Sequence, residues 1–309
     1  MTAADLLSRR LLFVTGKGGT GKTTVAASLA RHAASTGTRV LVVEMDDKGA
    51  LAAALGCGPL AFEPVEVAPN LAAMAMNTED SLREYLRLFV RMPIVTTLGP
   101  LARILDFVAN AAPGVKEILA VGKVCWEVRE RRWDLVVVDA EASGHVVAQV
   151  DAPRSLAALV PVGLIRDQVR WMQELLADPA TTGVVVTSLA EEIAVSETVA
   201  LLDRLASDTT VAVATVVCNR VPASVVAESD EAPLDALLAR VRSGSAEGPL
   251  VAPLELVAVA AERRRRALSH LRRLLGRAAQ VPAPVIVLPE VRTGAVVDRL
   301  VDDLAGELS

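Results

Sequence analysis

Aromatic residues and long apolar runs are scarce in this 309-residue chain. Aromatic residues make up 3% of the sequence although hydrophobic residues make up 52%, so the core must be built mainly from valine, leucine and alanine. That composition suits a parallel sheet covered by helices. No run approaches about 18 uncharged apolar residues, so the sequence predicts no transmembrane segment. The formal net charge of −5 argues against stable binding of nucleic acid across the surface.

The chain also lacks a cysteine pair and a secretion signal. Its three cysteines, Cys57, Cys125 and Cys218, lie far apart and form no C-x-x-C motif, which indicates reduced thiols. Residues 1–10 carry charges of both signs and no apolar segment, unlike a secretion signal. We therefore expect a cytoplasmic protein.

Apolar, β-branched runs alternate with helical periodicity, the pattern of an α/β fold with a doubly wound, mostly parallel sheet. The first helix is predicted over Lys22–Ser35, with Gly37 as a left-handed stop. Residues 75–130 are too long for a simple crossover, and we expect them to form a helical insertion within a single domain that spans residues 1–309. The predicted strands are Leu11–Thr15, Arg39–Glu44, Asp134–Asp139, Gly183–Thr187, Val211–Asn219 and Pro284–Leu288.

A phosphate-binding loop follows the first predicted strand. The segment reads G-K-G-G-T-G-K-T-T over residues 16–24, which contains the motif G-x-x-x-x-G-K-[ST] between a strand and a helix. Glycines let the backbone wrap a triphosphate, and the helix N-terminus adds a positive dipole end. We expect Lys22 to neutralise the β- and γ-phosphates and the Thr23 hydroxyl to bind Mg²⁺. The predicted nucleotide-binding residues of the loop are Gly16, Gly18, Gly19, Thr20, Gly21, Lys22, Thr23 and Thr24.

Carboxylates follow two of the predicted strands. Four apolar residues precede Asp139, and with a phosphate loop upstream this pattern predicts a carboxylate on Mg²⁺ or on one of its waters. Asp46 and Asp47 follow the second strand, where one carboxylate could orient the attacking water or hold a magnesium-bound one. Either could instead cap the following helix, Ala50–Leu55, and local sequence does not separate the two interpretations.

The base is predicted from the end of the fifth strand. Residues 218–222 read C-N-R-V-P and lack the N-K-x-D tetrad that usually reads guanine. Asn219 can still bond the adenine edge, so we expect ATP as the nucleotide. The alternative for Asn219 is a turn residue after a strand.

Together these segments resemble the deviant-Walker-A (SIMIBI-class) ATPases, which include MinD, ParA and the nitrogenase iron protein. Their loop reads K-G-G-x-G-K-[ST], and residues 17–23 match at every fixed position. In that class the extra lysine reaches the nucleotide of a facing subunit, so the resemblance implies a dimer in which Lys17 acts in trans. It also implies that Lys17, Lys22 and Asp46 are the catalytic residues.

Within that class the chain is most similar to the ArsA and tail-anchored-protein-targeting group, and to its short actinobacterial members. Residues 40–51 align without a gap with the group's V-L-L-I-S-T-D-P-A-H-N-L, which places the water-activating aspartate at Asp46. Residues 139–145 resemble its second switch, D-T-A-P-T-G-H. Residues 288–292 resemble its adenine loop, which implies base contacts from Pro289 and Val291. The implied metal-binding set is Thr23, Asp46 and Asp139.

The departures from this pattern bear on activity. Glu141 brings a negative charge into the second switch; pointing inward, it would repel the γ-phosphate by about 4 kcal/mol at an effective dielectric near 20. We expect it to point outward, although slow hydrolysis or a partly degenerate subunit remains an alternative. The scattered cysteines argue against arsenite extrusion, iron–sulfur chemistry and a zinc-clamped dimer.

Two functions remain open. In the first, the protein is a dimeric switch ATPase, a homodimer or a heterodimer with an ArsA-like paralogue, whose nucleotide state controls binding of an apolar client or membrane protein. In the second, it is a MinD/ParA-like positioning ATPase that acts on membrane or DNA through basic surface such as residues 262–277, although that segment also fits an ordinary surface helix. The C-terminal segment 296–308 carries mostly acidic charges and suits anionic lipid poorly. We favour the first.

Overall fold

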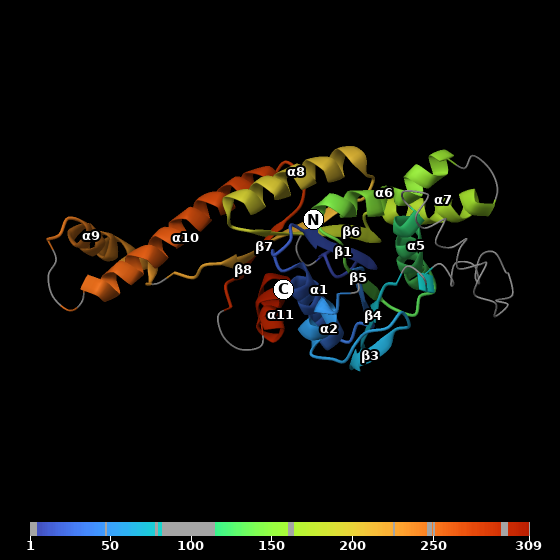
Figure 1. Ribbon diagram of the computed structural model, residues 1–309, viewed down its shortest axis with the longest axis horizontal. Coiled ribbons are helices and arrows are strands. Elements are labelled where there is room, and N and C mark those ends of the chain that lie inside the picture. The colour runs from blue at the N-terminus through green and yellow to red at the C-terminus, as the bar shows by residue number, and fades with distance from the viewer. Residues whose placement is uncertain are drawn as a thin grey trace.

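The protein is an α/β fold built on one twisted sheet with helices on both faces (Figure 1). The structure is a computed structural model, and it describes residues 5–46, 48–77, 80–81, 115–159, 164–224, 226–245, 249, 251–291 and 296–308. Among these residues eight strands form the sheet in the order β3-β4-β2-β5-β1-β6-β7-β8. All neighbouring strands are parallel except β3 and β4. The predicted doubly wound, mostly parallel sheet is confirmed.

The elements have the following bounds. The strands are β1 (Leu11–Gly16), β2 (Val40–Glu44), β3 (Val65–Ala68), β4 (Leu71–Ala75), β5 (Leu135–Asp139), β6 (Thr182–Leu189), β7 (Val213–Val221) and β8 (Val285–Pro289). The helices are α1 (Lys22–Ser35), α2 (Ala50–Leu55), α5 (Val115–Arg129), α6 (Ser143–Leu159), α7 (Leu164–Ala177), α8 (Glu192–Asp208), α9 (Glu231–Arg242), α10 (Val251–Ala278) and α11 (Val296–Leu308).

Both faces of the central strands are buried, which explains their uninterrupted apolar sequences. In β1, Leu11 and Phe13 belong to the core under α5, α6 and α8, whereas Leu12 and Val14 belong to the core under α1 and α11. Successive side chains of a strand point to opposite faces, so each such strand contributes to two cores. The cores hold the carboxyl ends of β1, β2 and β5 together at one edge of the sheet.

The six predicted strands are confirmed with small shifts at their ends, and α1, α2 and the left-handed Gly37 are found where they were predicted. Strands β3 and β4 were missed. Strand β4 is mostly alanine, a poor strand former, and β3 is a short edge strand with half of its residues exposed. Of the predicted insertion 75–130, residues 78–79 and 82–114 lie outside the described residues; the final part forms α5, which packs on α6 and β5.

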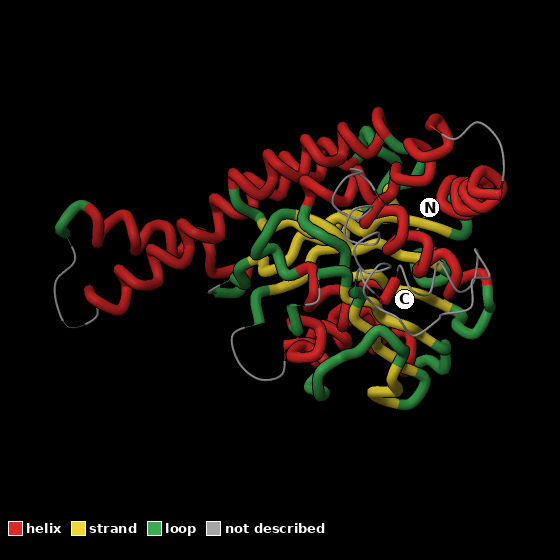
Figure 2. Tube along the Cα trace, turned by 45° about the vertical axis from the view of Figure 1, so that its right-hand side comes forward, coloured by secondary structure: helices red, strands yellow, loops and turns green. Residues whose placement is uncertain are grey.

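Helices α9 and α10 form a hairpin that projects from the sheet, as Figures 1 and 2 show from two directions. The C-terminal half of α10 packs on α8 and β7, whereas its N-terminal half packs beside α9 and leaves Leu256 and Val259 exposed. The predicted arginine-rich surface helix lies in α10. Several of its arginines have acidic partners: Arg263 with Glu290, Arg265 with Asp235 and Glu262, Arg266 with Glu262, and Arg277 with Asp203.

The C-terminal helix α11 has its apolar side on the body of the protein. Its buried residues are Val297, Leu300, Leu304 and Leu308, and it packs mainly on α1. Arg31 of α1 also forms an ion pair with Asp298. The apolar side of α11 is therefore not free to lie in a membrane surface. None of the helices within the described ranges is long and apolar enough to span a bilayer.

A buried ion cluster fixes the end of α5 next to the residues that precede β5. The Glu127 carboxylate is fully buried and accepts hydrogen bonds from Arg132 at 2.8 Å and from the indole nitrogen of Trp133 at 3.1 Å. Lys123, also buried, lies 2.9 Å from Glu127 and 4.9 Å from the ring centre of Phe62. Removing the carboxylate would take this ion pair away from a lysine that stays buried.

We predict that Glu127→Ala lowers the free energy of unfolding by roughly 3–5 kcal/mol, because the buried Lys123 loses its ion pair with Glu127. Urea denaturation followed by circular dichroism measures this change. Glu130→Ala is the control, because Glu130 is exposed just after the same helix, and it should change stability by less than about 0.5 kcal/mol. A loss below about 1 kcal/mol for Glu127→Ala would contradict the assigned role of the cluster.

Candidate nucleotide-binding site

The loop between β1 and α1 has backbone angles that only glycine adopts easily. Gly16 has φ of +150°, and a Cβ there would lie 2.2 Å from the backbone oxygen of Thr187. Gly21 precedes α1 with φ of +90°, and its Cβ would lie 2.4 Å from the Asn219 amide nitrogen. No side chain caps the first turn of α1. Its amides therefore point out of the helix N-terminus toward the loop, as an anion-binding site requires.

Thr23 and Asp139 meet at the carboxyl edge of the sheet. The Thr23 hydroxyl donates a 2.6 Å hydrogen bond to Asp139 Oδ2. Asp139 is 7% exposed, and its Oδ1 is buried with no hydrogen-bond partner among the described residues. Burial raises the pKa of Asp139 to about 6; the nearby carboxylates of Glu44 and Asp46 also raise it, whereas Thr23 and Lys22 oppose the shift. An unpartnered buried carboxylate oxygen beside a hydroxyl is a suitable position for a hard cation.

The donor set fits magnesium rather than a softer metal. Within the described ranges no three His, Cys, Asp or Glu side chains cluster as a metal site. Mg²⁺ commonly binds through one or two protein oxygens, with waters and phosphates completing its coordination. Thr23 and Asp139 would hold such an ion.

The phosphate loop is tied to the two neighbouring strands. Thr20 Oγ1 lies 2.7 Å from Thr187 Oγ1 of β6 and donates to the Lys17 carbonyl at 2.8 Å. Asn219 of β7 donates its amide to the Thr20 carbonyl at 3.0 Å, and its Oδ1 accepts from the Arg220 amide at 2.9 Å. Asn219 therefore supports the loop in this structure, and its contact with adenine stays a prediction.

The two loop lysines differ in their surroundings. The side chain of Lys17 forms an ion pair with Glu197 of α8 in the same chain. Both side chains are partly exposed, at 35% and 44%, so this pair can exchange. Lys22 begins α1 and lies close enough to Asp139 to favour its charged form. The action of Lys17 on a facing subunit stays a prediction.

Asp46 lies beside the site in an ion pair with Lys48, at 2.6 Å. Asp47 lies outside the described residues. Glu141 is one-third exposed with its carboxylate 3.7 Å from His145 Nδ1, and burial followed by the charge of Asp46 raises its pKa. The Glu141 side chain is thus partly exposed, which agrees only in part with the expectation that it points outward. The charge of Asp46 raises the pKa of both Asp139 and Glu141, so Asp46 lies near both carboxylates.

The two predicted base-reading segments are neighbours. Strand β8 ends at Pro289, which pairs with Val221 of β7, two residues after Asn219. The Glu290 amide donates to the Val221 carbonyl at 3.0 Å, and Val291 packs against the core under α1. The base contacts of Pro289 and Val291 stay predictions.

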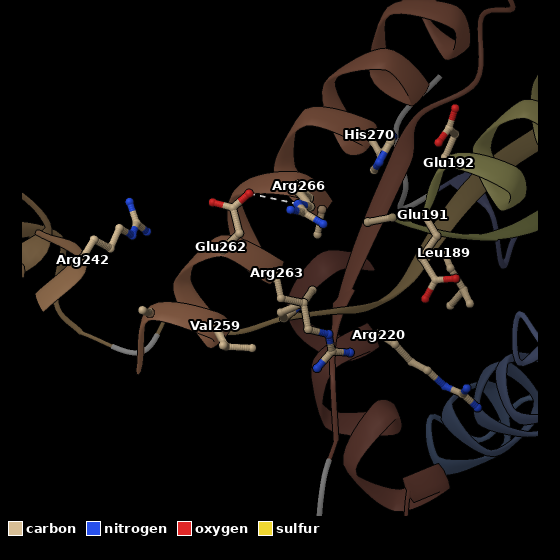
Figure 3. Close-up of a pocket in the computed structure, with 14 residues that line it drawn as sticks. Leu189, Glu191, Glu192, Arg220, Arg242, Val259, Glu262, Arg263, Arg266 and His270 are labelled. Atoms are coloured by element: carbon tan, nitrogen blue, oxygen red, sulfur yellow. Dashed lines mark hydrogen bonds and ion pairs between the residues drawn. The ribbon is translucent and has the colours of Figure 1, made fainter. Parts of the chain in front are cut away.

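A cavity of about 640 Å³ opens beside this region, between the start of α8, the end of β7 and α10. Figure 3 shows Arg266 paired with Glu262 on α10, with Glu191 and Glu192 at the start of α8 across from them. None of its lining residues belongs to the phosphate loop, so it is a separate hollow next to the nucleotide site.

The three cysteines lie on different parts of the fold, Cys57 after α2, Cys125 on α5 and Cys218 on β7. Cys125 and Cys218 are buried, and burial raises the pKa of each thiol to about 12. Cys57 is partly exposed near the end of α2. Within the described residues no three His, Cys, Asp or Glu side chains gather as a metal site.

Three residues at this edge were not predicted from the sequence: Glu44, Thr187 and Glu197. Thr187 and Glu197 contact the phosphate loop from more than 160 residues away, and nothing local marks them. Glu44 is buried at the end of β2 and carries a sequence signal that was available. A carboxylate at the end of an apolar strand, six residues before the first residue of a helix whose N-cap is glycine, stands where hydrogen bonds to that helix are possible.

A strand, a glycine loop, a helix N-terminus and a carboxylate on the neighbouring strand define a phosphate-loop nucleotide-binding protein. A sequence model of the family described as anion-transporting ATPase (ArsA ATPase) matches residues 9–173. The chain belongs to this family, which confirms the resemblance stated from the motifs.

Relatives from bacteria and fungi support this membership. The chain is 31% identical over 208 residues to ATPase BagA of Mycobacterium tuberculosis, covering 64% of this chain and 61% of the relative. It is 31% identical over 152 residues to ATPase get3 of Schizosaccharomyces japonicus, covering 48% and 45%. It is 28% identical over 167 residues to ATPase GET3 of Chaetomium globosum, covering 53% and 49%. The chain thus spans about half to three-fifths of the length of these relatives.

The raised pKa of Asp139 predicts a pH-dependent stability of the metal-free protein. Because the folded state holds this proton more tightly than the unfolded state, the group contributes stability below pH 4 that is lost as pH rises through about 6. A shift from 3.8 to about 6 corresponds to a loss of about 3 kcal/mol. Urea denaturation of the wild type and of Asp139→Asn without metal, between pH 4 and 7, measures this as a growing difference.

Asp134→Asn is the matched control at the other end of the same strand. Its hydrogen bonds with Arg39 lower the pKa of Asp134 to about 2, so its contribution is fully present above pH 4 and constant up to pH 7. A wild-type minus Asp139→Asn difference that is equally flat over this range would contradict the burial effect.

Proposed function

We propose that this protein binds ATP and Mg²⁺ and hydrolyses ATP to ADP and phosphate. The observation that carries this proposal is the pairing of Thr23 with a buried, half-satisfied Asp139 next to an uncapped helix N-terminus. The N-terminal amides of α1 and the side chain of Lys22 would bind the phosphates. Bound Mg²⁺ would supply positive charge next to the β- and γ-phosphates. The ATPase names of the relatives support the same activity.

Asp46 is the residue that we propose to orient the attacking water. It lies on the loop after β2 at the carboxyl edge of the sheet, where a carboxylate beside the γ-phosphate can hold a water in line. Lys48 now occupies one of its oxygens and must give up this contact for Asp46 to accept a proton from water. The negative charge of Glu141 lies near that of Asp46. It favours slow turnover, because the two carboxylates repel the approaching γ-phosphate.

We further propose a dimer, in which each Lys17 reaches the nucleotide of the facing subunit. Lys17 lies at the start of the phosphate loop on a partly exposed surface, and its bond to Glu197 is of the weak, exchangeable kind. The partner is a second copy or an ArsA-like paralogue. Nucleotide-driven closure would control the binding of an apolar client or a membrane protein by the segment 75–130, which we expect to form a helical insertion. We expect this to take place in the cytoplasm.

The alternative positioning role has less support. It relied on basic surface such as the arginine-rich segment 262–277, and several arginines of that segment are paired with acids. The C-terminal helix α11, whose acidic charge suits anionic lipid poorly, has its apolar side buried on α1. The ATP preference rests on Asn219 and on the missing N-K-x-D tetrad.

Lys22→Ala should abolish nucleotide binding, because the main positive charge on the β- and γ-phosphates is lost. Titration of a fluorescent ATP analogue in the presence of Mg²⁺ measures this, with at least a hundredfold weaker affinity expected. Lys48→Ala is a control on the same edge and should retain affinity within about threefold. Unchanged affinity in Lys22→Ala would place the nucleotide elsewhere.

Lys17→Ala should bind ATP normally and lose turnover, because its lysine serves the other subunit. Asp46→Asn should also bind ATP without hydrolysing it. Mixing the two inactive variants tests action in trans: in a mixed dimer, the Lys17→Ala subunit keeps its own Asp46 and receives a lysine from the Asp46→Asn subunit. We expect phosphate release to recover well above the sum of the two variants measured apart.

Activity that stays at that sum would show that Lys17 acts within its own subunit. Loss of nucleotide binding in Lys17→Ala would lead to the same conclusion.

A further inference from the structure

A second buried carboxylate, Glu44, lies next to the proposed magnesium site. Glu44 ends strand β2 and is 2% exposed. Its Oε1 accepts hydrogen bonds from the backbone amides of Ala50 at 2.8 Å and Leu51 at 3.3 Å, in the first turn of α2. Its Oε2 is buried and has no hydrogen-bond partner among the described residues. One oxygen of this carboxylate therefore binds the amides of α2, and the other has no hydrogen-bond partner among the described residues.

The unsatisfied half is on the side of the sheet where Asp139 lies. Strands β2 and β5 are parallel neighbours, and Glu44 is in register with Asp139. Val42 and Val137, each two residues earlier in its strand, both belong to the core under α1, so the side chains of Glu44 and Asp139 project from this same face. The charge of Glu44 is also one of the causes that raise the pKa of Asp139.

Two buried carboxylates thus stand side by side, and each has one oxygen that finds no hydrogen-bond partner in the part of the chain that the structure describes. Buried polar atoms are seldom left unsatisfied in native proteins, and neighbouring like charges in a medium of low dielectric repel each other. A bound cation removes both costs. Mg²⁺ keeps several of its waters when it binds to proteins, so the contact from Glu44 to the cation would pass through one of these waters.

We propose that Glu44 is a second carboxylate of the magnesium site, which accepts a hydrogen bond from a water bound to the ion. Mg²⁺ keeps several of its waters when it binds to proteins, and such waters need acceptors. This proposal rests on the proposed function, because the ion enters with the nucleotide. Glu44 is a positioning residue: it holds the metal-bound water on one oxygen and α2 on the other.

The same geometry links the metal to the loop that carries Asp46. Glu44 immediately precedes this loop, and its Oε1 holds the helix that follows it. When the ion binds, Oε2 becomes ordered by the metal-bound water, and the start of α2 is fixed relative to β5. Metal binding should therefore slow hydrogen exchange of the Ala50 and Leu51 amides.

The test uses the full chain with ADP and a titration of Mg²⁺, or of Mn²⁺ followed by electron paramagnetic resonance. Glu44→Gln keeps a carbonyl oxygen for the α2 amides and removes the charge. We expect the affinity for the metal to fall by about tenfold or more, as is typical when a residue that supports a metal ligand is changed. ADP affinity without metal should stay unchanged, and the metal-induced protection of Ala50 and Leu51 should disappear.

Glu66→Gln is the control, because Glu66 is an exposed carboxylate on β3 of the same sheet. It should leave metal affinity unchanged. In the absence of metal, Glu44→Gln should unfold at a urea concentration equal to or higher than the wild type, because it relieves repulsion with Asp139. A residue that only capped α2 would instead give a less stable variant with normal metal affinity.

Normal metal affinity in Glu44→Gln would overturn this proposal while leaving the proposed function intact, provided that Asp139→Asn weakens metal binding in the same assay. Failure of the wild-type protein to bind ADP with or without Mg²⁺ would instead overturn both proposals.

Discussion

The site depends on one hydrogen bond, between the Thr23 hydroxyl and the buried carboxylate of Asp139. It joins the first turn of α1 to the end of β5, and it is possible because parallel strands bring their carboxyl ends to one edge of the sheet. The glycine loop is shaped by the same crowding, since β6 and β7 leave no space for a Cβ at Gly16 or Gly21. A buried anion is thus held beside a helix N-terminus before any ligand arrives.

Electrostatic balance connects this hydrogen bond to the rest of the edge. The charges that act on Asp139 are those of the carboxylates Glu44 and Asp46 and of one cation, Lys22. At the same edge, Lys17 and Lys48 each form an ion pair with an acid of the same chain. A nucleotide with its cation would reorganise these pairs: the metal would reduce the repulsion among carboxylates, and the phosphates would compete for the lysines. Binding energy would thereby be converted into movement of the loops that carry the lysines, which is what a nucleotide switch needs.

The sequence predicts those features that are encoded locally. The motif at residues 16–24 and the four apolar residues before Asp139 indicate the loop and the neighbouring carboxylate, and both are found at the same edge. The buried strands are predictable because both of their faces are apolar. Strand β4 is not predictable in this way, because alanine is more typical of helices than of strands. Its pairing with β2 makes this segment a strand.

Long-range partners also escape sequence analysis. Glu197 reaches Lys17 across 180 positions, and the role of Glu44 depends on the register between β2 and β5. The sequence predicts that Asn219 lies at the nucleotide site, and it does lie beside the phosphate loop. In this structure, however, its amide donates a hydrogen bond to the Thr20 carbonyl rather than to a base. Burial and register, rather than composition, decide these roles.

The most direct measurement of the central claim is a crystal structure with Mn²⁺ and a non-hydrolysable ATP analogue, with anomalous diffraction locating the ion. The account predicts one manganese peak within coordination distance of Thr23 Oγ1 and close to Asp139, with the phosphates wrapped by residues 16–24. Nucleotide density in the cavity between α8 and α10, with no metal at Thr23, would contradict it.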